Sequence, residues 1–193
     1  MCEAAAAGSG GATRLTRRAV LGTLAWGAAG AFAAGAGAAQ AADGGSRHLT
    51  LHNTHTQESL SVEYWRDGRY DEAALAVVDR VLRDHRDGSV HAIDRALLDV
   101  LCRVADYTGY PPEFAVISGY RSAASNAALH ARSAGVSAHS LHVLGQAIDV
   151  RLAGCDLPRL RDAGLALAAG GVGYYPGPQF VHLDTGRVRS WSG

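Results

Sequence analysis

The sequence predicts an α+β fold, a single domain in which helices pack on an antiparallel sheet. Short stretches of alternating polarity near both ends of the domain indicate strands, and amphipathic stretches between them indicate helices. The last strands follow one another with only a turn between them, which favours antiparallel pairing. The chain has 193 residues and is 48% hydrophobic, which suits one globular domain, and it contains no internal repeat.

The first half of the domain is predicted to be a hairpin followed by two helices. Residues 47–53 and 59–65 alternate in polarity around a polar Thr-His-Thr-Gln-Glu segment, as the strands of a hairpin do. Residues 70–86 place apolar side chains on one helical stripe. Residues 93–107 repeat them at i, i+3, i+4 and i+7, so this is the clearest amphipathic helix, and a Gly-Tyr-Pro-Pro segment ends it.

The second half alternates strands with helices and closes with a second hairpin. Ser122 is suited to cap a helix, Pro158 suits the first turn of another, and a Pro-Gly-Pro-Gln turn separates the last two strands. The elements are expected over residues 114–118, 122–133, 146–152, 158–169, 172–175 and 180–185.

The first 41 residues are predicted to be an export signal. Arg17 and Arg18 precede an apolar run, rich in Ala and Gly, that ends in a small-x-small cleavage pattern at residues 39–41. Paired arginines before a mildly apolar core are typical of the twin-arginine route. The alternative is a membrane anchor, for which the run has few Leu, Ile and Phe. The expected organisation is a signal over 1–41, a flexible lead-in over 42–46 and the domain over 47–193. We expect the exported protein to lie in the periplasm or cell envelope.

Export would leave two cysteines in the mature chain. In an oxidising compartment Cys102 and Cys155 could pair. Cys102 lies among apolar residues of the amphipathic helix, however, so we favour a small buried hydrophobic residue over a disulfide.

The charge composition argues against several functions. The 18 basic residues, all Arg, balance 18 acidic ones, so no field would attract nucleic acid or an anionic membrane, and we expect neither partner. Without Lys, the chain cannot use a Schiff base, a Ser-Lys dyad or a P-loop lysine. We expect a monomer.

Two histidines and a carboxylate are candidate ligands of one metal ion. His142 lies in a loop before the strand of Asp149, and His182 lies on a strand that could pair beside it. Because paired strands lie about 4.8 Å apart, these side chains can meet over one face of the sheet. Imidazole and carboxylate suit Zn²⁺, and three ligands leave a position open for water, as in hydrolytic sites. The alternative is a chance spacing without a metal.

Four ordered motifs resemble those of the murein endopeptidase K (YcbK-like) family, and the likeness covers about residues 47–191, including the Leu-His-Asn-Thr-His-Thr segment of the first hairpin. This family belongs to the wider group of lysostaphin, D-Ala-D-Ala carboxypeptidase and hedgehog-type zinc peptidases. The motifs are Ser-Gly-Tyr-Arg-Ser at 118–122, Ser-x-His-x-x-Gly-x-Ala-x-Asp at 140–149, Gly-Gly-Val-Gly-Tyr-Tyr-Pro at 170–176 and Phe-Val-His-x-Asp-Thr-Gly at 180–186.

The resemblance implies a zinc peptidase that cuts peptide cross-links between the stem peptides of peptidoglycan. It implies one Zn²⁺ bound by His142, Asp149 and His182. Arg121 would then bind a substrate carboxylate or steady a developing oxyanion, its alternative being a structural role in the turn. Ser140 would contact substrate or orient the metal-binding loop.

The general base is where the chain departs from the wider group. Relatives there carry a Glu three residues before the last ligand or a His two residues before it, and here these positions hold Gln179 and Phe180. Asp184 lies two residues after His182 and so faces the same side of a strand. It is the candidate base or a carboxylate that orients His182, and both alternatives stay open. Two other functions also stay open: a non-catalytic zinc-containing wall-binding module, and a D,D- or L,D-carboxypeptidase.

Overall fold

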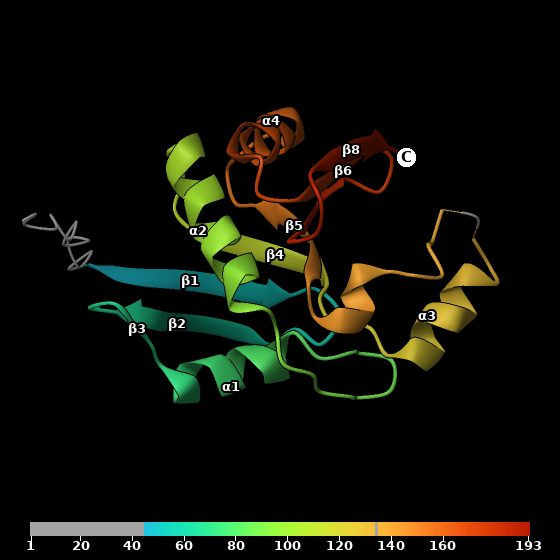
Figure 1. Ribbon diagram of the computed structural model, residues 1–193, viewed down its shortest axis with the longest axis horizontal. Coiled ribbons are helices and arrows are strands. Elements are labelled where there is room, and N and C mark those ends of the chain that lie inside the picture. The colour runs from blue at the N-terminus through green and yellow to red at the C-terminus, as the bar shows by residue number, and fades with distance from the viewer. Residues whose placement is uncertain (1–44, 134) are drawn as a thin grey trace, which may run out of the picture. The chain divides into compact units, whose positions relative to one another are not determined.

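An eight-stranded sheet forms the centre of the computed structural model, which describes residues 45–133 and 135–193 (Figure 1). The strands lie in the order β3-β2-β1-β4-β5-β7-β6-β8. Their bounds are β1 Ser46–Asn53, β2 Ser59–Arg66, β3 Arg69–Tyr70, β4 Glu113–Ser118, β5 Ala147–Leu152, β6 Gly171–Tyr175, β7 Phe180–Asp184 and β8 Arg189–Ser192. The helices are α1 Glu72–Val81, α2 Arg95–Thr108, α3 Ala123–His130, the 3₁₀ turn η1 Leu141–Leu144, and α4 Leu157–Leu167.

The α+β class is confirmed, and the sheet as a whole is mixed. Strands β4, β5, β7 and β6 pair antiparallel, as expected. β1 and β4 pair in parallel because α1 and α2 lie between them in the chain and carry it back across the sheet. β6 and β8 also pair in parallel, because the chain runs from β6 through β7 and returns to the free edge of β6.

Short polar residues cap the helices and fix where they begin. Asp71, Asp94, Ser122 and Asp156 each accept a backbone N–H at the start of α1, α2, α3 and α4. The predicted Ser122 cap is confirmed, with Ser125 N–H donating to its Oγ over 3.1 Å. Three helices end earlier than predicted: α1 at residue 81 instead of 86, α3 at 130 instead of 133, and α4 at 167 instead of 169.

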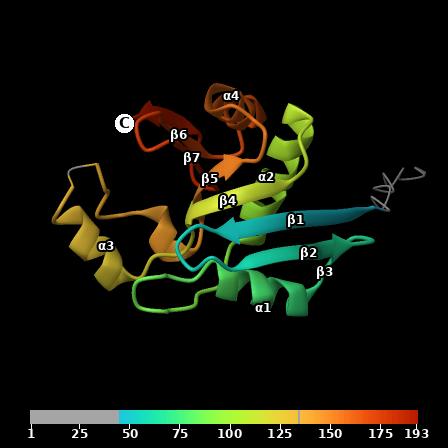
Figure 2. The ribbon, with the colours of Figure 1, turned by 180° about the vertical axis from the view of Figure 1, so that it is seen from behind.

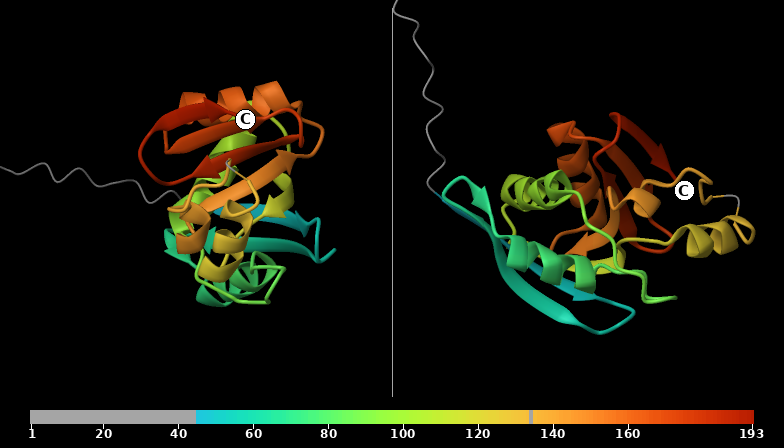
Figure 3. Two further views of the ribbon diagram at one scale, coloured as in Figure 1. Left: turned by 90° about the vertical axis from the view of Figure 1, so that its right-hand side faces the viewer. Right: turned by 60° about the horizontal axis from the view of Figure 1, so that its bottom comes forward.

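Alternation along the strands divides the sheet into an apolar face and a polar face. Helices α1, α2 and α4 cover the apolar face and enclose one core with its side chains. On β7, for example, Val181 and Leu183 are buried in this core, so His182 and Asp184 point to the opposite face. Figures 1 and 2 show α2 and α4 side by side, with α3 extending from the other end of the domain, and the right-hand view of Figure 3 shows the same separation.

The sequence did not reveal β3, β8 or the η1 turn, all of which are short. Cys102 and Cys155 are both free thiols. The predicted signal over residues 1–41 lies outside the described residues. Within the described part of the chain, no helix is both long and apolar enough to cross a bilayer.

Candidate metal centre and cleft

The three candidate ligands come from two neighbouring strands and one short turn. Asp149 on β5 and His182 on β7 are direct partners in the antiparallel register, so their side chains stand next to each other on the polar face. His142 reaches them from η1, which immediately precedes β5. All three side chains are buried, and the structure therefore brings together the set that the sequence predicted.

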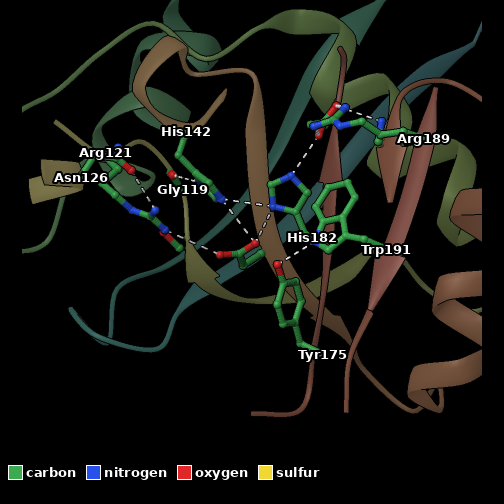
Figure 4. A network of polar contacts seen from close by, with 12 residues as sticks. Gly119, Arg121, Asn126, His142, Tyr175, His182, Arg189 and Trp191 are labelled. Atoms are coloured by element: carbon green, nitrogen blue, oxygen red, sulfur yellow. Dashed lines mark hydrogen bonds and ion pairs between the residues drawn. The ribbon is translucent and has the colours of Figure 1, made fainter. Parts of the chain in front are cut away.

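The three side chains converge on one point (Figure 4). Asp149 Oδ1 lies 2.8 Å from His182 Nδ1 and 3.3 Å from His142 Nε2. The two imidazole nitrogens lie 3.3 Å from each other. One candidate ligand atom from each residue thus lies within 4.8 Å of the other two, which is close enough to hold a single ion.

The outer partners of the two imidazoles indicate that the inner atoms are all acceptors. His142 Nδ1 lies 2.7 Å from the Gly119 carbonyl oxygen, which can only accept, so the proton belongs on Nδ1 and the lone pair on Nε2. His182 Nε2 lies 3.0 Å from the Asp184 carboxylate, which leaves the lone pair on Nδ1. Three lone-pair atoms that face one another repel unless a cation lies between them, so this donor set fits a metal ion.

The electrostatics of the centre follow from the same contacts. Burial alone would raise the pKa of Asp149, but the neighbouring His142 and His182 lower it well below its usual value. Burial would lower the pKa of His182, but the neighbouring carboxylates of Asp149 and Asp184 raise it. The Asp149 carboxyl is therefore held in its charged form, as a metal ligand must be.

Asp184 lies on the far side of the His182 ring from Asp149. Its Oδ2 contacts His182 Nε2 at 3.0 Å and Arg189 Nη2 at 2.6 Å. Its Oδ1 accepts the N–H groups of Gly171 and Gly186, both over 2.9 Å, and Arg189 Nη1 over 3.0 Å. Burial would raise the pKa of Asp184, but these partners lower it well below its usual value.

Two glycines of β6 let β8 support the site on β7. In the register of the sheet, Gly173 lies between His182 and Trp191, and Gly171 is paired with Arg189. A Cβ on Gly173 would lie 2.7 Å from the Trp191 ring. Because the glycine has no side chain, Trp191 can pack against His182 with ring centroids 5.1 Å apart, although a strand separates them.

Arg121 flanks the other side of the centre, in the turn after β4. Its backbone N–H donates to the His142 carbonyl over 3.1 Å, and its Nη2 lies 3.9 Å from Asp149 Oδ2. Nη2 also donates to Ser118 Oγ over 3.2 Å, and Nη1 to Asn126 Oδ1 over 3.3 Å. Its Nε is the one buried side-chain polar atom in residues 45–133 and 135–193 without a partner. Burial lowers the pKa of Arg121, while Asp149 opposes that effect.

An open cleft of about 720 Å³ leads from the surface to the three ligands. Ser140 lies at its rim, half-buried, and makes no capping hydrogen bond with its side chain. Among the described residues that line the cleft, Asp149 is the only acidic one, and Asp184 does not line it. Phe180 lines it too, stacked on Tyr175 with ring centroids 4.6 Å apart.

Several residues of the site were not identified from the sequence. Trp191 and Tyr175 line the cleft, Arg189 holds Asp184, and Asn126 holds Arg121. The Gly-Val-Gly spacing of residues 171–173 was the available signal, because two glycines on one face of a strand leave room for large neighbours.

The fold and the site together define a metallopeptidase: a buried His-Asp-His set at the base of an open cleft, beside a buried arginine. Residues 40–191 match the family model described as peptidoglycan L,D-endopeptidase MepK. The chain belongs to this family, which confirms the resemblance in the motifs.

Two named relatives show the extent of the similarity. The chain is 45% identical over 146 residues to peptidoglycan L,D-endopeptidase MepK of Escherichia coli strain K12. The aligned residues make up 75% of this chain and 80% of the relative. The chain is 40% identical over 148 residues to the probable peptidoglycan L,D-endopeptidase MepK of Haemophilus influenzae, covering 76% and 80%. The comparison with solved structures found no match.

Proposed function

We propose that this protein is a zinc-dependent endopeptidase that hydrolyses peptide cross-links between the stem peptides of peptidoglycan. The single observation that carries the proposal is the convergence of three buried lone-pair atoms at the base of an open cleft. The names of its relatives point to the bond, one that joins an L centre to a D centre. A peptidoglycan substrate supports a location in the cell envelope, which is also where the twin-arginine-like signal expected over residues 1–41 would send the protein.

His142, Asp149 and His182 are the proposed ligands. A bound Zn²⁺ would polarise the scissile carbonyl and lower the pKa of a water molecule toward neutrality. The protein contributes the geometry: the Gly119 carbonyl fixes the His142 ring, and the strand register fixes Asp149 beside His182. All three side chains are largely buried, and they reach solvent through the cleft that they line.

Arg121 is proposed to bind an oxygen of the substrate next to the metal. Its guanidinium is held at the cleft by Ser118 and Asn126, while its Nε–H has no acceptor among the residues that the structure describes. A substrate carboxylate or the developing oxyanion would satisfy that donor. Ser140 at the rim, whose hydroxyl does not cap η1, is proposed to hydrogen-bond the substrate backbone.

Asp184 is proposed to orient His182, the second of the two roles that its position in the sequence left open. Its carboxylate contacts the imidazole nitrogen opposite the proposed metal side. Its other contacts go to Arg189 and to two backbone N–H groups, and it does not line the cleft. A general base must reach the proton that it removes, so the geometry favours orientation over base catalysis.

A second function has one observation in its favour. The chain has Gln179 and Phe180 where the wider group carries its proton acceptor, and Asp184 faces away from the cleft. A wall-binding module that keeps its metal for structure would need no base.

A digest of defined cross-linked muropeptides by the full, zinc-loaded chain separates the two functions. The peptidase halves the dimers, as read by mass spectrometry, and a chelator stops the reaction. A carboxypeptidase would instead remove a single terminal residue. His142→Ala is the control, because it should lose both the metal and the activity. One zinc per chain, binding to sacculi and no cleavage product would overturn the proposal in favour of the binding module.

A further inference from the structure

The phenol of Tyr175 is held in one orientation by Trp191. The indole Nε1–H of Trp191 donates to the Tyr175 oxygen over 2.7 Å, as Figure 4 shows. An indole nitrogen can only donate, so the phenol oxygen is the acceptor in this bond. The phenolic proton of Tyr175 is therefore directed away from Trp191.

The tyrosine ring is also fixed by its neighbours. Phe180, its partner in the register between β6 and β7, stacks on it at an interplanar angle of 23°. Trp191 in turn is packed over Gly173 against the His182 ring. The ring is therefore held by packing, and the hydroxyl oxygen is occupied by Trp191, so the hydroxyl proton is the part of this side chain whose role is still to be explained.

Tyr175 lies at the wall of the cleft. Tyr175 is half-buried, and it lines the cleft together with Arg121 and His182. Within residues 45–133 and 135–193 no protein group accepts the Tyr175 proton. In Figure 4, Tyr175 and Arg121 approach the three candidate ligands from different sides. Arg121 and Tyr175 thus bring one charged and one neutral hydrogen-bond donor to the cleft that leads to the three candidate ligands.

We propose that Tyr175 is a further catalytic residue, whose hydroxyl donates a hydrogen bond to the oxygen of the scissile carbonyl as that oxygen gains negative charge. Trp191 is the positioning residue that directs this hydroxyl. The inference rests on the proposed endopeptidase function. A donor that is already oriented stabilises charge without reorganisation at the moment of reaction, which is why such donors contribute to turnover more than to substrate binding.

Tyr175→Phe tests the role, because it removes only the hydroxyl and keeps the ring on Phe180. We expect kcat to fall about 100-fold, as for loss of one oxyanion donor, with KM and zinc content unchanged. Tyr174→Phe is the matched control: Tyr174 faces α4 on the other side of β6, under Arg161, and the change should leave kcat unaltered. A kcat for Tyr175→Phe equal to that of the control would overturn the assignment.

Trp191→Phe tests the positioning role, because it keeps a ring on His182 and removes the N–H. We expect kcat to fall about tenfold, the effect of one neutral hydrogen bond. The double variant should be no worse than Tyr175→Phe alone, because Trp191 acts through Tyr175. Losses that multiply in the double variant would contradict this coupling.

Binding of a phosphinate analogue of the cross-link separates this inference from the proposed function. The charged oxygen on its tetrahedral phosphorus imitates the developing oxyanion. Tyr175→Phe should therefore weaken binding of the analogue to the zinc-loaded chain about 100-fold and leave binding of the cleaved product unchanged. If the unaltered chain cleaves no cross-link, the proposed function fails and the phosphinate still decides the role of Tyr175. If the unaltered chain cleaves and the variant matches it in both measurements, the Tyr175 assignment alone fails.

Discussion

The two charged residues that flank the metal centre differ in how completely the protein satisfies them. Asp184 on β7 accepts from His182, from two backbone N–H groups and from both terminal nitrogens of Arg189, at 2.6 to 3.0 Å. Arg121 is also buried, but its side chain makes contacts of 3.2 to 3.9 Å and its Nε–H has no acceptor in the described part of the chain.

This difference indicates which residue supports the site and which one awaits a ligand. A fully satisfied carboxylate is rigid and acts on its neighbour, the His182 ring. A buried donor without a partner costs about 1 to 3 kcal/mol, and such a cost is expected where a ligand restores the missing bond. Of the two charges, Arg121 is therefore the one suited to contact substrate.

Arg121→Lys should produce the largest change in turnover. Lys keeps the positive charge but loses Nε and the planar fork that binds an oxygen pair. We expect kcat/KM on cross-linked muropeptides to fall about 100-fold or more, with the urea midpoint of unfolding unchanged or raised. A structural role for Arg121 in the turn makes the opposite prediction, a lower urea midpoint with near-normal turnover of the folded protein.

Asp184→Asn should mainly weaken the binding of the metal ion. The amide fills the same space but loses the charge that fixes the His182 ring and pairs with Arg189. We expect zinc affinity to fall about 10- to 100-fold, and added zinc should restore turnover. Asp156→Asn, which alters only the cap of α4, serves as the control. Lost turnover at every zinc concentration, with affinity unchanged, would instead identify Asp184 as the general base.

Much of the centre could be predicted from the sequence because it depends on strand periodicity. A residue and its partner on a neighbouring strand must meet, so Asp149 and His182 were expected to converge once two strands were recognised. The role of β8 could not be predicted in this way. Arg189 and Trp191 lie on a strand of four residues, too short to show a period, and its parallel pairing with β6 depends on where the chain turns.

The role of the glycines of β6 also could not be predicted from the sequence. From the sequence alone, Gly171 appears only as a residue that follows the predicted helix over 158–169. No neighbouring residue indicates that the side chains of Asp184 and Arg189 lie next to it. In the structure, a Cβ at Gly171 would collide with the ion pair of Asp184 and Arg189. A contact that spans three strands leaves no local pattern, which is why the sequence indicated the candidate ligands and did not indicate the residues that support them.

The turn that carries Arg121 offers the smallest and most specific test, through pH. Asp84 is fully buried and accepts the Ser122 N–H, next to Arg121, over 3.0 Å. Burial would raise the pKa of Asp84, but hydrogen bonds from Ser125 and from backbone N–H groups lower it to about 2. Because the folded pKa lies below the unfolded one, the resulting stability is complete above about pH 4 and is lost as the pH falls toward 2. The shift corresponds to about 2 kcal/mol.

Urea unfolding of the zinc-free protein at pH 6 and at pH 3, compared with Asp84→Asn, measures this contribution. The variant should be less stable than the unaltered chain at pH 6, and the gap should narrow at pH 3. The other carboxylates titrate in both proteins, so they cancel in the difference. A constant gap would mean that Asp84 supports the turn by its shape and not by its charge. In that case packing, and not the charge of Asp84, would hold the turn that carries Arg121. Asp184 would differ from it, because charged partners hold Asp184.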